Sequence, residues 1–155
     1  MGDYLELVLG VHLRLDERAL RNLRWLLLDE SEPGDVAPFP DEHPLWRQEH
    51  ARGGLSGGGL ATRGRAPRLT ELADYYNEDL PPGPPEGEMH ELFVWTSIKR
   101  FVWTVQLLDW LGEHIVEPRE RVIGWSVWEG SDPISPVVLM WDPEARAIRE
   151  RPIQP

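Results

Sequence analysis

Apolar and polar residues alternate near the start of the chain, and this pattern predicts a strand. Leucine or valine occupies every second position from Leu5 to Leu15, and mainly polar or small residues lie between them. A period of two places alternate side chains on opposite faces of a strand, so the leucine and valine set is expected to face a core. Asp16 then provides a cap for a helix from Glu17 to about Asp29.

A second strand and helix are predicted in the block from residue 89 to residue 148. The strand covers residues 92–96, and its apolar side chains on both faces predict a position inside the sheet. Ser97 is the expected cap of a helix that runs to about Ile115. This block also holds six of the tryptophans, so it is expected to contribute much of the core.

Three further strands are predicted after this helix. Ile123, Trp125 and Val127 alternate with other residues and give the first of these strands an expected inward face. The second strand covers residues 137–141. A tight turn then leads to an edge strand around Ile148.

The segments between these two blocks lack a regular period. Residues 30–68 are rich in proline and glycine and are predicted to form a long loop, with a weak edge strand at about 60–65. A helix is expected from Thr70 to Leu80, and a proline-rich linker follows at 81–88.

The order of these elements predicts one α+β domain over residues 1–155. The expected architecture is a mainly antiparallel sheet of about four to six strands with two or three helices on one face. A ferredoxin-like arrangement with an added hairpin is one form that fits this order.

The second half of the chain resembles a pattern in small uncharacterised bacterial proteins. In that pattern a strand leads through Ser-x-Lys into a helix that carries Leu-Asp-Trp, and a glycine-started hairpin follows. The matching residues are Ser97, Lys99, Leu108, Asp109, Trp110, Gly124 and Pro136. The resemblance covers about a third of the chain and implies a fold but no activity.

The charge and composition exclude several classes of function. The net charge is −11, from 27 acidic and 16 basic residues, and such a surface repels nucleic acid and attracts basic partners. Cysteine is absent, which excludes thiolate metal sites and cysteine nucleophiles. The longest uncharged apolar run, Phe101 to Leu108, is too short to span a bilayer, and the first residues do not resemble a secretory signal. A cytoplasmic protein without membrane contact is therefore expected.

The second predicted helix carries more apolar surface than a sheet can cover. One stripe consists of Phe101, Val105, Leu108, Gly112 and Ile115, and a stripe on nearly the opposite side consists of Trp103, Leu107, Trp110 and His114. A helix that packs on a sheet needs one apolar face. The second stripe therefore needs a cover, and its four residues are the predicted binding site.

Three covers fit this second stripe. Residues 30–88 of the same chain are the first, through side chains such as Phe39, Leu45, Trp46, Tyr75 or Tyr76. Another copy or a partner protein is the second, because tryptophan is enriched in interface anchors. A small-molecule pocket with His114 as its polar group is the third.

No catalytic residue, metal ligand or cofactor site is assigned from the sequence. The segment Gly54 to Gly58 matches G-x-S-x-G, but a nucleophile elbow needs a strand before the serine and a helix after it, and neither is predicted there. Histidine pairs such as His43 and His50 lie in a loop, where their spacing fixes no coordination geometry. A solvated surface explains these residues more simply.

The leading hypothesis is therefore a non-catalytic acidic interaction module, such as an inhibitor or immunity-type protein for a basic partner. The alternative is a small enzyme or ligand-binding domain with a tryptophan-lined pocket. The two hypotheses differ in shape. A closed apolar cavity that contains His114 and a carboxylate favours the enzyme, whereas a flat or convex tryptophan patch beside carboxylates favours partner binding.

Overall fold

The fold is an antiparallel sheet with two helices, seen in a computed structural model that describes residues 4–48, 51–62, 88–99, 103–117, 119–130 and 134–153. The elements in chain order are β1 (Tyr4–Leu15), α1 (Glu17–Leu26), the 3-10 helix η1 (Pro44–Arg47), β2 (Gly59–Thr62), β3 (Glu88–Lys99), α3 (Thr104–Gly112), β4 (Arg121–Trp128), β5 (Val137–Asp142) and β6 (Ala147–Pro152).

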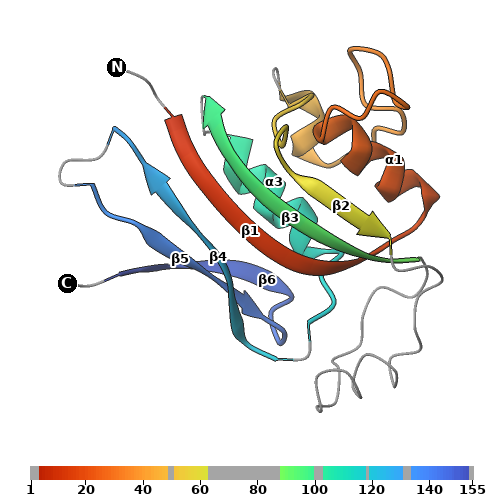
Figure 1. Cartoon of the computed structure of the whole chain (residues 1–155). Helices are drawn as coiled ribbons and strands as arrows, with labels where there is room; N and C mark the ends of the chain where they lie inside the picture. Colours follow the sequence, from red (N-terminus) through yellow and green to blue (C-terminus); the bar gives the residue numbers. More distant parts are fainter. Residues whose placement is uncertain are drawn as a thin grey trace.

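The sheet has six strands in the order β2-β3-β1-β4-β5-β6, and every neighbouring pair is antiparallel (Figure 1). Its longest pairing joins β1 to β3 over their whole length, from Tyr4 opposite Lys99 to Leu15 opposite Glu88. The predicted α+β class with a mainly antiparallel sheet is confirmed. The ferredoxin-like arrangement is not confirmed by this strand order.

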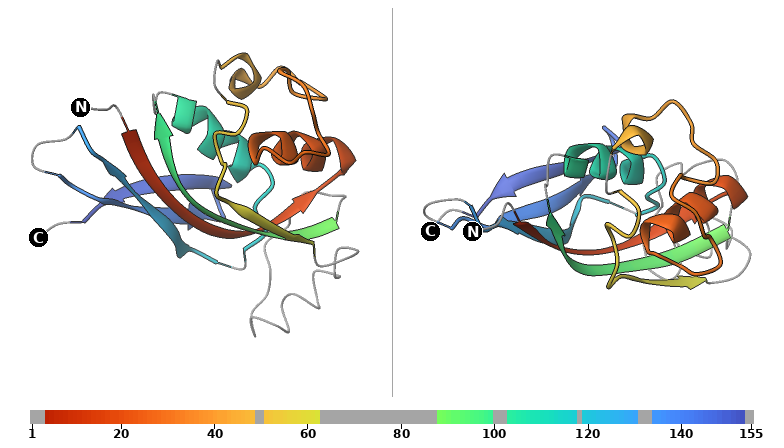
Figure 2. Two further views of the ribbon diagram at one scale, coloured as in Figure 1. Left: turned by 45° about the horizontal axis from the view of Figure 1, so that its top comes forward. Right: turned by 90° about the horizontal axis from the view of Figure 1, so that it is seen from above.

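Both helices lie on the same face of the sheet (Figure 2). The leucines and valines at the odd-numbered positions of β1 are buried against this side, as the alternating pattern predicts. The intervening side chains from Tyr4 to His12 are partly exposed on the opposite side, which we call the open face. No helix long and apolar enough to cross a bilayer occurs within the described ranges.

The second long helix begins later than the sequence predicted. Ser97 is not its cap, because this residue lies in β3 opposite Glu6, where its backbone belongs to the sheet. The helix α3 instead follows Trp103, and no side chain caps its first turn. A serine before an amphipathic run was therefore a misleading start signal, because pairing with β1 extends the strand through the predicted cap.

The inward face predicted for β4 is also wrong. Ile123 is buried as expected, but Ser126 is the next buried residue, and the Trp125 side chain is 36% exposed. The register shifts between Val122 and Gly124. Because one extra residue in a strand reverses which side chains face the core, this bulge places Trp125 on the open face.

Strand β3 lies inside the sheet as predicted, between β2 and β1. Its two apolar faces do not both meet a core, however. Leu92 and Val94 are fully buried, whereas the Phe93 and Trp95 side chains are 55% and 64% exposed. No described helix covers this second face.

Some of the remaining predicted elements are present in the structure, and others lie outside the described residues. The strands at 137–141 and around Ile148 are present as β5 and β6, and β2 covers the start of the predicted weak strand. The predicted helix from Thr70 to Leu80, and the linker at 81–88 apart from its last residue, lie outside the described residues.

Candidate functional site

Three of the four residues predicted to bind a partner or ligand are buried by the chain itself. Trp103, Leu107 and Trp110 are each exposed by 2% or less. The indole of Trp103 lies against Gly54 so closely that a Cβ atom on this glycine would clash with it. The predicted fold-back of residues 30–88 therefore supplies a cover for this tryptophan.

The cover over Trp110 is a row of aromatic rings. Trp46 of η1 meets Trp110 edge-on with ring centroids 5.2 Å apart, and Trp46 in turn meets Trp25 of α1 at 6.3 Å. Trp110 also contacts the His114 ring, with ring centroids 4.7 Å apart. Burial lowers the pKa of His114, because a charged imidazole would lose its hydration in this position.

The loop that supplies this cover is fixed to α1 by polar contacts. The side-chain amide of Asn22 donates to the Phe39 carbonyl at 2.9 Å and accepts from the Phe39 N–H at 3.0 Å. The Arg21 guanidinium donates to both oxygens of Glu32 at 2.7 and 3.0 Å. These contacts explain how a segment without periodic hydrophobicity packs over a helix.

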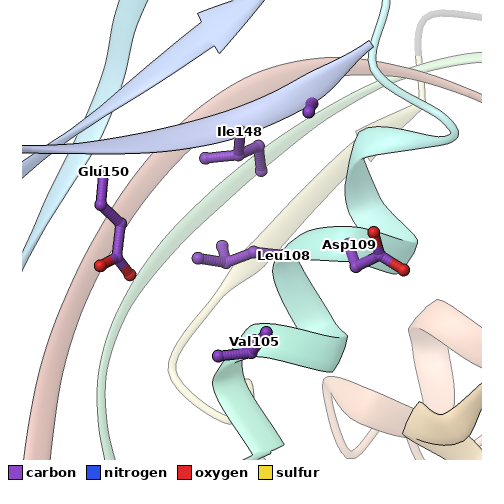
Figure 3. Close-up of a pocket in the computed structure, with 6 residues that line it drawn as sticks. Val105, Leu108, Asp109, Ile148 and Glu150 are labelled. Carbon is purple, nitrogen blue, oxygen red and sulfur yellow. The ribbon is translucent and has the colours of Figure 1, made fainter. Parts of the chain in front are cut away.

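A groove lies beside α3, but it does not involve the predicted site. It has a volume of about 340 Å³, and its walls are Val105, Leu108 and Asp109 of α3 and Ala147, Ile148 and Glu150 of β6 (Figure 3). None of the tryptophans and neither His114 nor His43 is among these lining residues.

Among the residues that the structure describes, the two most exposed aromatic side chains, Phe93 and Trp95, lie on the open face of the sheet. In the register of the strands, Val8 of β1 lies between Trp95 of β3 and Trp125 of β4, and Trp125 lies opposite Val138 of β5. Phe93 is on the same side of β3 as Trp95. We call these five residues the open-face patch: Val8, Phe93, Trp95, Trp125 and Val138.

A carboxylate contacts the edge of the open-face patch. The indole N–H of Trp95 donates to Oε1 of Glu6 at 3.0 Å, which satisfies the polar edge of the ring and leaves most of its surface exposed. Glu91, two residues before Phe93, is on the same side of β3, and its side chain is 40% exposed. The patch is therefore an apolar surface with acidic groups at its edge.

A buried carboxylate lies further along the same face. Glu117 is 1% exposed, and its Oε1 accepts from both the backbone N–H and Nδ1 of His12, at 3.0 and 3.1 Å. Its second oxygen accepts from the Arg121 guanidinium at 3.1 Å. These contacts satisfy a carboxylate that would otherwise be costly to bury, and they join the segment after α3 to β1 and β4.

One group of side chains has metal-like geometry. Ligand atoms of His43, Asp109 and Glu113 lie within 4.8 Å of one another. However, Nδ1 of His43 accepts from the Leu45 N–H at 3.2 Å, so the proton of the neutral ring is on Nε2, which is 2.8 Å from Asp109. This tautomer favours a hydrogen bond to the carboxylate over coordination of a metal.

Sequence reasoning missed the open-face patch, although one signal for it was present. Apolar residues on both faces of β3 predict two buried faces, whereas the face with Phe93 and Trp95 is exposed. No local sequence signal marks the register shift at Val122 that exposes Trp125. Comparisons with protein-family models, with curated proteins and with solved structures found no significant match to this chain.

Proposed function

We propose that this protein is a non-catalytic interaction module that binds a basic partner protein through the open-face patch. The observation that supports this most directly is the exposure of three large aromatic side chains on β3 and β4, the two strands that flank β1. Phe93, Trp95 and Trp125 are 55%, 64% and 36% exposed.

Exposed aromatic rings forgo stabilisation that a partner can supply. Burying one large apolar side chain contributes about 1.5–3 kcal/mol, and tryptophan is frequent among the residues that dominate interface energies. Contiguous apolar patches on monomeric proteins commonly mark contact sites. Three such rings around Val8 form an anchor of the size that interfaces use.

The charge of the chain supports a basic partner over a second copy. The net charge of −11 repels an identical molecule and attracts a cationic one. Glu6 and Glu91 lie at the patch itself, so a partner with lysine or arginine around an apolar centre would complement both parts of this surface.

The shape of the surface supports partner binding over an enzyme pocket. The sheet bends around the helices (Figure 2). By the strand register, the open-face patch lies on the face opposite the buried leucines of β1. A tryptophan beside a carboxylate on an exposed sheet face is the arrangement expected of an interface. The groove at α3 does not contain His114, which was the polar group expected for a catalytic or ligand pocket.

The experiment compares the wild type with the double variant Phe93→Thr and Trp95→Thr. Threonine keeps a high strand propensity while it removes both rings. Proteins retained by the immobilised wild type would be identified and purified, and the affinity of each would be measured by calorimetry. We expect a basic partner whose Kd rises at least about a hundredfold for the double variant, because two anchors are lost.

The matched control is Val36→Ser, which removes an apolar side chain that is 70% exposed and lies outside the patch. Its Kd should stay within about twofold of the wild-type value. The affinity should also fall between about 0.05 M and about 0.5 M salt. A purified partner that binds the double variant as well as the wild type would overturn the proposal, as would a wild-type dimer that the two substitutions dissociate.

A further inference from the structure

We infer that the groove between α3 and β6 binds an extended basic peptide segment of another protein, which adds to the sheet as a strand beside β6. This site is distinct from the open-face patch, and it goes beyond the function proposed above. Its evidence is the lining of the groove, the outer edge of β6, which no other described strand pairs with, and the charge at the rim.

The groove has an apolar base and two carboxylates at its rim. Leu108 is 7% exposed and forms the base together with Ile148, while Val105 is 69% exposed. Figure 3 shows Ile148 and Glu150 projecting from β6 on the side that faces Leu108. A volume of about 340 Å³ is enough for several side chains.

Among the strands that the structure describes, β6 is the last of the sheet and has β5 as its one neighbour. The N–H of Ile153 donates to the Pro136 carbonyl at 3.3 Å, so this is a hydrogen-bonded pair. Hydrogen-bonded and non-hydrogen-bonded pairs alternate along an antiparallel ladder. Arg151 and Arg149 therefore also belong to hydrogen-bonded pairs with β5.

The backbone N–H and C=O groups of Ile148 and Glu150 consequently point away from β5. No backbone hydrogen bond across this outer edge occurs in the part of the chain that the structure describes. Pro152 occupies the next outward position, where proline is tolerated because no neighbouring strand needs its N–H. An incoming strand can therefore pair along the groove and stop near this proline.

The negative charge at the rim of the groove favours a basic occupant. Glu150 is exposed, and the side chain of Asp109 is 73% exposed. A lysine or arginine stem can pack over Ile148 while its charged end reaches these carboxylates. Arg149 and Arg151 do not offset them in the groove, since both alternate to the other face of β6 and pair with Asp142 at 2.6 Å and Glu120 at 3.6 Å.

A second copy of this chain fits the edge less well than a basic peptide. Antiparallel pairing of two β6 strands about Arg149 would place two arginines opposite each other. Pairing about Glu150 would do the same with two glutamates. Like charges directly opposite each other destabilise both of these registers, and the net charge of −11 repels a second copy in any register, so the groove favours a foreign basic segment.

The test uses a short synthetic peptide of alternating lysine and valine, capped at both ends and labelled for fluorescence anisotropy. We expect saturable binding to the wild type, with amide chemical-shift changes at Ile148 and Glu150. Methylation of alternate peptide nitrogens should raise the Kd at least about tenfold, because it removes the donors that pair with β6. The same peptide with glutamate in place of lysine should not bind.

Glu150→Lys should raise the Kd at least about tenfold by reversing the charge at the groove. The matched control is Glu144→Lys, an equal charge change at an exposed position in the turn before β6, and it should stay within about twofold. Unfolding curves confirm that both variants fold. Equal binding of the methylated peptide, or shift changes at Phe93 and Trp95 instead of β6, would overturn the inference.

Discussion

Gly124 allows β4 to lie against β1 at the bulge. A Cβ atom here would clash with the Val8 carbonyl oxygen and come within 3.0 Å of Cα of Leu9. These are backbone atoms in the middle of a sheet and cannot rotate away. We expect Gly124→Ala to lower the free energy of unfolding by about 2–4 kcal/mol in urea titrations.

Gly59→Ala is the control for this prediction. Gly59 also lies in a strand, but a Cβ atom there would meet nothing within 4 Å. Its effect should be less than about 1 kcal/mol. If Gly124→Ala proved equally mild, the close approach of β4 to β1 at the bulge would be incorrect.

His114 should make the stability depend on pH. Its pKa in the folded protein is lowered by burial, so below the ordinary value of about 6.5 the unfolded chain binds a proton that the folded protein does not. Stability is therefore complete above this pH and falls as the pH decreases toward the folded pKa.

The measurement is denaturant unfolding at about pH 7 and about pH 5 for the wild type and for His114→Phe, which keeps a ring against Trp110. The variant should lose less stability on acidification than the wild type. An equal loss in both proteins would mean that other groups account for the pH dependence.

At the scale of elements, the contact between Trp46 and Trp110 joins η1 to α3. Trp25 of α1 continues this row, so one side chain in a short 3-10 helix links two helices.

We expect Trp46→Ala to lower the free energy of unfolding by about 2–4 kcal/mol, because it leaves a cavity over Trp110. Val36→Ala, at an exposed position of the same loop, should change it by less than about 0.5 kcal/mol. Denaturant titration checks both, and a mild Trp46→Ala would show that η1 is not needed to cover α3.

Elements with a strong local pattern could be predicted from the sequence. The alternation in β1, the Asp16 cap, whose side chain accepts from the Ala19 N–H at 2.7 Å, and the hairpin of β5 and β6 are all encoded by near neighbours. The start of α3 could not be predicted from Ser97, because pairing between strands more than eighty positions apart determines where β3 ends.

The location of the exposed site depends even more than the element boundaries on contacts between residues that are distant in the sequence. The surplus of apolar surface was recognised, but it was assigned to α3, where Trp46 and the residues around Gly54 in fact cover it. The aromatic side chains that remain more than half exposed, Phe93 and Trp95, lie on the sheet. The exposure of aromatic side chains on this face depends on a bulge in β4 and on the lack of a described helix over Phe93 and Trp95, and neither follows from local periodicity.

At the scale of the whole molecule, the aromatic residues packed between helices and those exposed on the sheet should have opposite effects on stability and on binding when they are substituted. Trp46 is part of the packing between helices, whereas Phe93 and Trp95 are more than half exposed in the folded protein. A side chain that stays exposed contributes little to the free energy of unfolding, since its hydration changes little on folding. Stability and binding are therefore assigned to different residues.

We accordingly expect the double variant Phe93→Thr and Trp95→Thr to unfold within about 1 kcal/mol of the wild type, a smaller change than for Trp46→Ala. The loss of the hydrogen bond from Trp95 to Glu6 is partly offset, because the freed carboxylate is hydrated. The variant should also be more soluble, because a contiguous apolar surface is removed. Denaturant titration and precipitation by ammonium sulfate measure both properties. A stability loss as large as that of Trp46→Ala would show that these rings belong to the core of the fold, and the open face would then lack the anchor that partner binding requires.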